Sequence, residues 1–211
     1  IFSDDWETHL THVRLTLETL AKHNFKLAPK KSKFGKSSIP WLGFVVSKEG
    51  VAVDTSKTEA ITKLPHPGNI RQLQRYMGSV NYFAKWIPSL AVINKPLRNL
   101  LKKDTPWYFD DDCKEAMAEI NRHLTSPPIM AFPDASKQFV LVTDASRYGV
   151  GGCLSVRPVD SDDPTLERPV MYFSQSLSKA ETNWDARQLE AYALLVRCKN
   201  KGYQSISFQQ H

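Results

Sequence analysis

The sequence has few cysteines, no long apolar run and no export signal. Cys113, Cys153 and Cys198 are odd in number and far apart, with no CxxC pair, so they predict neither a disulfide framework nor a zinc site. No run of about eighteen apolar residues occurs. The amino terminus lacks the basic-then-apolar order of a signal peptide, and no Asn-x-Ser/Thr acceptor is present. These absences favour a soluble intracellular protein without a membrane partner.

The net charge of +6 is divided unevenly along the 211 residues. Residues 1–103 carry 17 Lys and Arg against 7 Asp and Glu, whereas residues 104–211 carry 11 against 15. Such a basic half attracts polyanions through a salt-dependent, sequence-independent force. Lys30, Lys31, Lys33 and Lys36 concentrate the charge. The cluster predicts phosphate binding, and a solvated loop is the alternative.

The first segment predicts a helix over residues 5–22, followed by a β-hairpin. Asp4, three residues before Glu7, is typical of a helix cap, which argues against Asp4 and Asp5 as a polymerase aspartate pair because such a pair belongs in a turn between strands. Residues 39–53 predict one strand through Trp41 and Phe44, a four-residue turn at 47–50, and a second strand.

The second segment, residues 54–125, predicts helices broken by prolines. The best helix runs over residues 69–86, with Asn69 as its cap, and its polar side carries Arg71 and Arg75. Gly78 lies in mid-helix, where glycine costs about 1 kcal/mol relative to alanine. Close approach of a neighbouring helix or of a ligand backbone would explain it, and both interpretations stay open. A last helix is expected over about residues 111–124.

The third segment predicts three strands and then a helix over about residues 183–201. Asp144 ends the first strand and a glycine-rich turn follows it. Glu190 lies on the shoulder of the apolar face of the helix, so the two carboxylates can meet if the helix crosses the sheet. Two such carboxylates are hard ligands suited to Mg²⁺. An ion pair between Glu190 and Arg197 is the alternative.

Motifs along the whole chain resemble the reverse transcriptase of gypsy-type LTR retrotransposons. They are Ile1-Phe2-Ser3, Trp6 to Leu10, Lys30-Lys31-Ser32-Lys33-Phe34, Trp41-Leu42-Gly43-Phe44, Tyr76 to Phe83, Ile87-Pro88, Lys95-Pro96-Leu97, Ser126 to Ile129, Thr143-Asp144-Ala145-Ser146 and Tyr172 to Leu177. Their order and spacing match the family over about residues 1–200.

The resemblance implies an α+β architecture in three parts. Residues 1–53 would be the end of the polymerase palm, a helix plus a primer-grip hairpin formed by Trp41, Leu42, Gly43 and Phe44. Residues 54–128 would be a helical thumb whose helix tracks the minor groove, with Arg71, Arg75 and Gly78 in contact with nucleic acid. Residues 129–211 would be a truncated RNase H-like α/β domain. Lys30, Lys31 and Lys33 are expected to bind phosphates.

For the RNase H-like part, the resemblance implies that Asp144 and Glu190 are catalytic carboxylates that bind Mg²⁺. The implied partners are an RNA/DNA hybrid, a template-primer duplex and further Pol domains, in the cytoplasm or a virus-like particle. The family's polymerase aspartates precede the position of Ile1. If His211 matches the family's Thr-Asp-His histidine, Gln210 replaces the third aspartate, and a neutral amide cannot supply its charge.

Two functional hypotheses follow. In the first, the chain is a fragment of a reverse transcriptase with RNase H that keeps the nucleic-acid grip and half of the nuclease site. In the second, it is a non-catalytic nucleic-acid-binding protein from a decayed or domesticated element. The incomplete carboxylate sets favour an inactive polypeptide.

Overall fold

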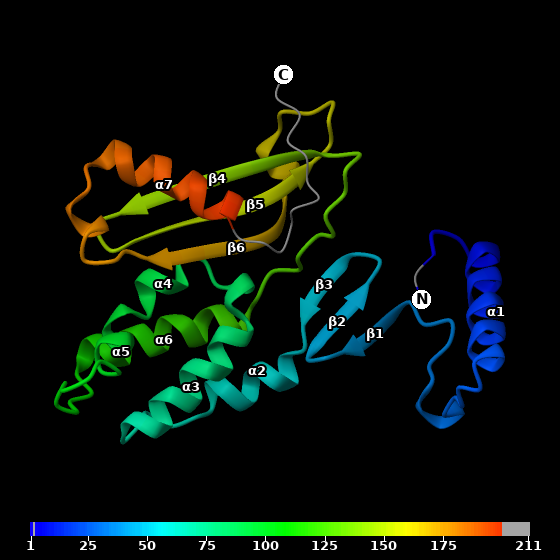
Figure 1. Cartoon of the computed structure of the whole chain (residues 1–211), viewed down its shortest axis with the longest axis horizontal. Helices are drawn as coiled ribbons and strands as arrows, with labels where there is room; N and C mark the ends of the chain where they lie inside the picture. The colour runs from blue at the N-terminus through cyan, green and yellow to red at the C-terminus, as the bar shows by residue number, and fades with distance from the viewer. Residues whose placement is uncertain (2, 200–211) are drawn as a thin grey trace. The chain divides into compact units, whose positions relative to one another are not determined.

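The structure is a computed structural model that describes residues 1 and 3–199. The chain divides into two compact units, residues 1–37 and 38–211. Helices and two three-stranded sheets alternate along it, in the mixed α and β class expected from the sequence (Figure 1). The domain boundaries expected after residues 53 and 128 stay a prediction. None of the described helices is long and apolar enough to cross a membrane.

The first unit holds the helix α1 (Trp6–Lys22) and a 3-10 turn at Pro29–Lys31. Asp5 caps α1, because its side chain accepts hydrogen bonds from both the backbone N–H and the hydroxyl of Thr8, at 2.9 and 2.7 Å. The capping role predicted for Asp4 therefore belongs to the next residue. These hydrogen bonds to the charged form lower the pKa of the Asp5 carboxyl.

The second unit begins with an antiparallel sheet of three short strands, β1 (Ser38–Trp41), β2 (Phe44–Ser47) and β3 (Gly50–Val53). The turn at residues 47–50 was predicted, but the strand expected through Trp41 and Phe44 was wrong. It is broken by a two-residue turn in which Leu42 and Gly43 have φ angles of 49° and 81°. Positive φ at both positions is typical of a tight hairpin turn, and glycine at the second position makes it accessible.

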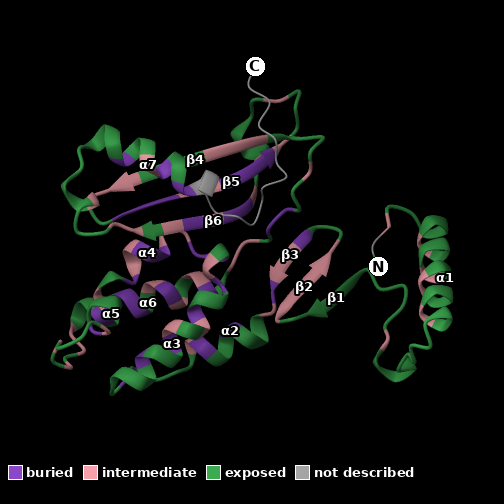
Figure 2. Ribbon diagram, viewed as in Figure 1, coloured by how far each residue is buried: buried purple, intermediate pink, exposed green. Residues whose placement is uncertain are grey.

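Five helices follow, as expected for a helical segment: α2 (Thr55–Thr62), α3 (Ile70–Tyr82), α4 (Leu90–Ile93), α5 (Lys95–Asn99) and α6 (Asp111–Thr125). Asn69 caps α3 as predicted, through a 3.0 Å bond from the Gln72 N–H. The helix ends at Tyr82, earlier than predicted, and a 3-10 turn covers Ala84–Trp86. Buried side chains of these helices form the first hydrophobic core, which Val53 of β3 joins (Figure 2).

The second sheet has the predicted strand order, with β4 (Gln138–Ser146), β5 (Gly149–Arg157) and β6 (Arg168–Ser176) paired antiparallel in sequence. The helix α7 (Ala186–Lys199) packs against β4 and β5, and its Ala193 and Val196 join the sheet residues in a second core. Met130 belongs to the first core and Ala131 to the second, so the cores meet at this point of the chain.

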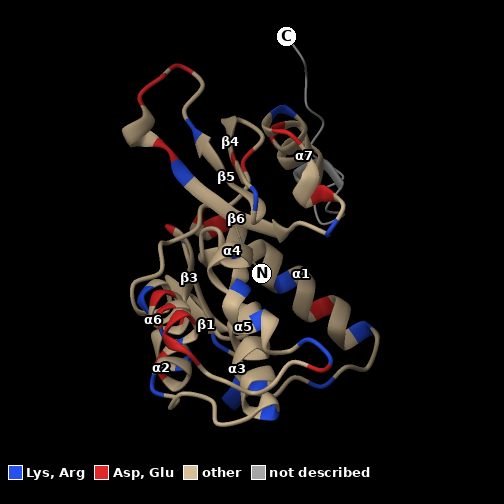
Figure 3. Cartoon of the chain, turned by 90° about the vertical axis from the view of Figure 1, so that its left-hand side faces the viewer, with Lys and Arg blue, Asp and Glu red and all other residues tan. Residues whose placement is uncertain are grey.

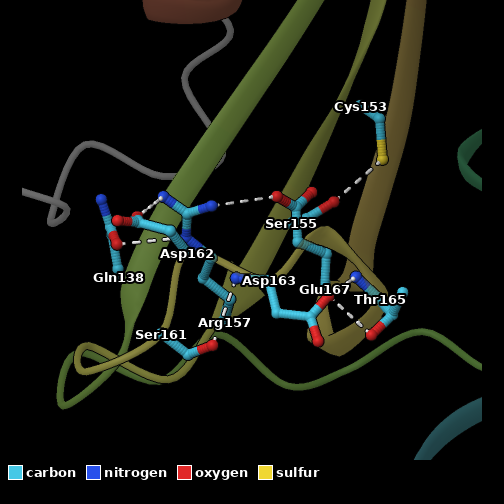
Figure 4. Close-up of polar contacts among 9 residues, drawn as sticks. All are labelled: Gln138, Cys153, Ser155, Arg157, Ser161, Asp162, Asp163, Thr165 and Glu167. Carbon is cyan, nitrogen blue, oxygen red and sulfur yellow. Dashed lines mark hydrogen bonds and ion pairs between the residues drawn. The ribbon is translucent and has the colours of Figure 1, made fainter.

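One side chain organises the polar loop between β5 and β6. Arg157 donates hydrogen bonds to Gln138 Oε1 at 3.1 Å and to Asp162 Oδ1 at 3.0 Å, and its guanidinium lies 3.5 Å from a Glu167 carboxylate oxygen (Figure 4). Its side chain is only 16% exposed, so these contacts lie partly out of water. The guanidinium fork therefore ties the middle and the end of the loop to the first residue of β4.

Candidate nucleic-acid interface and carboxylate pair

A basic and aromatic stripe runs along the exposed side of α3. Arg71, Arg75, Gly78 and Tyr82 are spaced by four, three and four residues, so they lie within about 60° of one another around the helix. All four are exposed. Leu73, Tyr76 and Val80 on the opposite side are buried in the first core. The helix is thus fixed by its apolar face and offers the stripe to solvent.

Gly78 does not serve packing within the described structure. A Cβ atom added at this position would meet no described atom within 4 Å. The interpretation that a neighbouring helix of this chain approaches Gly78 is therefore wrong for the described residues. The bare backbone at Gly78 lies between the Arg75 and Tyr82 positions of the stripe and is open to a molecule outside the chain.

The turn at Leu42 and Gly43 is attached to the end of this stripe. The Tyr82 hydroxyl donates a hydrogen bond to the carbonyl oxygen of Leu42. The Tyr82 ring stacks on Phe44 with a centroid distance of 5.3 Å, and Phe44 stacks in turn on Trp86 at 4.7 Å. Sequence reasoning omitted Tyr82 from the site, although its place eleven residues after Arg71 puts it on the same stripe.

The four residues of the hairpin motif fall into two structural classes. Trp41 and Leu42 are 60% and 67% exposed, so their side chains are free to contact a ligand. Phe44 is half-buried among the aromatic rings of the first core. Phe44 therefore anchors the turn, and the exposed Trp41 and Leu42 are the residues available to contact a ligand.

Four further lysines are candidates for contact with a polyanion, namely Lys57 on α2 and Lys30, Lys31 and Lys33 near the amino terminus. Lys57 on α2 lies beside the turn, because its Cγ is 3.9 Å from the position that a Cβ atom at Gly43 would take. The sequence did not indicate that Lys57 lies close to this turn. Lys30, Lys31 and Lys33 are exposed in the unit of residues 1–37. In Figure 3 the basic residues of α3 and α5 contrast with the acidic residues of α6.

Asp144 lies near the end of β4 and is exposed. It pairs with Gly151, whose added Cβ would point to Ser174 Cβ at 3.5 Å and Ser89 Oγ at 3.7 Å. Directly paired residues of antiparallel strands share a face of the sheet. Asp144 therefore projects from the face that α4 approaches.

Glu190 lies in the second turn of α7 and is exposed, so it does not tilt into the sheet as the pattern suggested. The side chains of Leu141 and Ala145 on β4 join the core that α7 covers, and they alternate with Asp144. The structure thus brings α7 against the strand that carries Asp144, but Asp144 projects from the other face of that strand.

The carboxylates have no competing partner in the described part of the chain. Neither Asp144 nor Glu190 forms a hydrogen bond or an ion pair with any residue whose side chain the structure describes, and Arg197, the alternative partner expected for Glu190, lies outside those side chains. Equally, no group of three or more His, Cys, Asp or Glu gathers into a metal-binding cluster among residues 1 and 3–196, whose side chains the structure describes. Burial raises the pKa of the nearby Cys153 thiol, which disfavours the thiolate form that a metal would need. Gln210 and His211 lie outside the described residues.

The sequence of this chain is similar to that of known proteins. Residues 109–203 match the RNase H-like domain found in reverse transcriptase. The chain is 32% identical over 211 residues to the retrovirus-related Pol polyprotein from transposon opus of Drosophila melanogaster, covering 95% of this chain and 20% of that protein. It is also 32% identical over 200 residues to the transposon Tf2-3 polyprotein of Schizosaccharomyces pombe, covering 95% of this chain and 15% of that protein.

The chain belongs to the Pol polyproteins of LTR retrotransposons. It spans about a fifth or less of the length of these curated relatives. The chain also shares its fold with two foamy viral protease-reverse transcriptase structures. One, titled as a complex of the dRH protein with double-stranded DNA, gives a TM-score of 0.79 at 18% identity and covers 93% of this chain and 35% of that one. The other, titled as a complex with an RNA/DNA hybrid, gives a TM-score of 0.77 at 17% identity and covers 94% of this chain and 26% of that one.

The aromatic stack predicts different roles for Phe44 and Trp41, the two aromatic residues beside the Leu42-Gly43 turn. Phe44→Ala should lower the free energy of unfolding by about 2–3 kcal/mol, because it empties a half-buried ring site between Tyr82 and Trp86. Trp41→Ala, on the exposed side of the turn, should change it by no more than about 0.5 kcal/mol. Urea denaturation of both variants measures the difference. Equal losses would show that Phe44 does not anchor the turn.

Proposed function

We propose that the Leu42-Gly43 turn and the α3 stripe form one surface that grips a template-primer duplex as part of a reverse transcriptase with RNase H. The observation that carries the proposal is the continuity of this surface, since the Tyr82 hydroxyl joins the turn directly to the stripe. This surface, termed the grip surface, consists of Trp41, Leu42, Gly43, Arg71, Arg75, Gly78 and Tyr82.

The chemistry of the grip surface suits a nucleic-acid backbone. Arg71 and Arg75 can donate hydrogen bonds and charge to phosphates, which gives affinity without sequence specificity. Gly78 allows a sugar-phosphate chain to approach the helix backbone more closely than any side chain would permit. Tyr82 and the exposed Trp41 supply flat apolar surface of the kind that packs against sugars and bases.

The expected ligands are a double-stranded template-primer and an RNA/DNA hybrid. The shared fold with foamy viral proteins that are titled as complexes with double-stranded DNA and with an RNA/DNA hybrid supports this class of partner. Lys30, Lys31 and Lys33 are proposed as additional phosphate contacts from the unit of residues 1–37. Their exposure keeps the ammonium groups available to a polyanion.

We further propose that Asp144 and Glu190 contribute to a Mg²⁺ site in the parent polyprotein. Both are exposed hard oxygen donors without a described partner, on elements that pack together. The fit of the described residues to a metal is incomplete, because they supply two carboxylates on opposite sides of β4 and no third ligand. Such paired carboxylates hold the two ions that serve hydrolysis of an RNA strand when the set is complete.

The grip surface predicts a specific dependence of duplex binding on α3. The double variant Arg71→Gln/Arg75→Gln should weaken binding about tenfold near 0.1 M salt and reduce the slope of log Kd against log salt by about two, one for each lost phosphate contact. Fluorescence anisotropy with a labelled RNA/DNA hybrid over a salt series measures both. Lys114→Gln/Arg122→Gln on α6 is the matched control, and an equal loss there would contradict the proposal.

Gly78 allows stability and binding to be separated. Gly78→Ala should raise the free energy of unfolding by about 1 kcal/mol, since the site is open and alanine is the better helix former. Gly78→Leu should fold equally well but weaken hybrid binding on the order of tenfold, because a long side chain holds the backbone of the ligand away. Ala118→Leu on the exposed side of α6 controls for added apolar surface. Full binding by Gly78→Leu would exclude close approach at this residue.

The carboxylate proposal is tested by Mg²⁺-dependent cleavage of the labelled RNA strand of a hybrid. We expect little or no cleavage by this chain, because its described residues supply only two carboxylates on opposite sides of β4; any cleavage that is measured should be lost in Asp144→Asn and in Glu190→Gln, with hybrid binding unchanged in both variants. Glu115→Gln, which removes an exposed carboxylate from α6, should leave the rate unchanged. Cleavage that persists in both the Asp144→Asn and the Glu190→Gln variant would contradict the assignment of these residues to the metal site.

A further inference from the structure

The two hydrophobic cores are joined by hydrogen bonds between α4 and β6. The backbone N–H of Ala91 donates to Ser174 Oγ at 2.9 Å. The Ser176 hydroxyl donates to the Ala91 carbonyl oxygen at 3.3 Å and accepts a hydrogen bond from the Arg98 guanidinium. Both serines are on the sheet face from which Asp144 projects, and the helices belong to the first core.

The helix approaches this face because glycine occupies two positions of β5. A Cβ added at Gly149 would lie 3.1 Å from a Val92 methyl group on α4 and 2.9 Å from the Gln175 carbonyl oxygen. At Gly151 it would lie 3.7 Å from Ser89 Oγ. The β5 strand therefore presents bare backbone where α4 crosses it.

The serine at position 174 satisfies a donor that α4 cannot satisfy itself. Ala91 is the second residue of a four-residue helix, so its N–H belongs to the first turn and has no partner within the helix. Ala91 is only 6% exposed, which removes water as a partner. A buried N–H without an acceptor is costly, and Ser174 supplies the acceptor from the sheet face that α4 approaches.

Three further contacts link the sheet β4–β6, and the segment that leads into it, to the preceding part of the chain. The Lys95 ammonium lies 3.7 Å from the centroid of the Tyr148 ring, in the turn between β4 and β5. On the hairpin side, Val51 and Met130 exchange backbone hydrogen bonds of 2.8 and 2.9 Å, and Arg168 at the start of β6 donates to the Glu49 carbonyl oxygen.

We propose that Ser174, Ser176 and Arg98 form a latch that makes the helices α2–α6 and the sheet β4–β6 move as one rigid body. The latch lies on the face that carries Asp144, so it fixes the separation between the α3 stripe and the end of β4. These three side chains are positioning residues. The importance of that separation for a bound duplex rests on the proposed function, whereas the rigid connection itself does not.

Nuclear magnetic resonance relaxation of backbone amides in the free protein tests the latch. In the wild type, amides of α6 and of β5 should report one rotational correlation time. Ser174→Ala, and separately Arg98→Ala/Ser176→Ala, should split it into two values and speed exchange of the Ala91 amide about tenfold. Unchanged chemical shifts in the interiors of both cores would show that each core remains folded.

Ser174→Thr is the matched rescue, because threonine keeps the hydroxyl acceptor and should keep a single correlation time. If Ser174→Ala fails to fold, Arg98→Ala alone, at an exposed site, gives the same test. Two correlation times in the wild type, or one in every variant, would overturn the latch. If the proposed grip surface is wrong, the wild type should bind the hybrid without salt dependence or not at all. That result would not change the correlation times measured for the free protein, so the two failures are distinguishable.

Discussion

The ring of Phe44 is the contact on which the proposed interface depends. It packs between Tyr82 and Trp86 and so attaches a short three-stranded sheet to the helical core. A hairpin of this size is marginal alone in water and needs a helix or a further sheet to cover one face. With Phe44 in place, Tyr82 reaches the Leu42 carbonyl oxygen, and the exposed turn is fixed relative to Arg71 and Arg75.

Much of the fold could be predicted from the sequence, because its elements have strong local signals. The cap at Asn69, the alternating strands around the glycine-rich turn and the proline-broken helices were all identified. The turn at Leu42-Gly43 was missed because leucine with a positive φ is rare, and the turn is held by contacts from distant residues, namely the aromatic stack, the Tyr82 bond to Leu42 and a 3.0 Å bond from the Asp54 N–H to the Gly43 carbonyl oxygen. The early end of α3 was missed because Ala84 and Trp86 keep the apolar pattern while the backbone tightens into a 3-10 turn.

The candidate sites could be predicted only in part. Sequence spacing identified Arg71 and Arg75 as one side of a helix and Gly78 as a glycine in mid-helix, and the open space above Gly78 needed coordinates. Spacing also placed Asp144 at a strand end and Glu190 on a helix that packs there, but it could not say which side of β4 each would occupy. The side of β4 from which Asp144 projects was read from its pairing with Gly151 on β5. This pairing cannot be read from the sequence of β4 alone.

The Arg157 cluster has a consequence for how this chain can vary. One guanidinium holds Gln138, Asp162 and Glu167, so the sheet ends of the loop between β5 and β6 are already joined. Closing a flexible loop becomes more expensive only with the logarithm of its length, about 0.6 kcal/mol for each doubling. The segment between Asp162 and Glu167 could therefore be lengthened, or exchanged for an inserted tag, while the register of the strands on either side is kept.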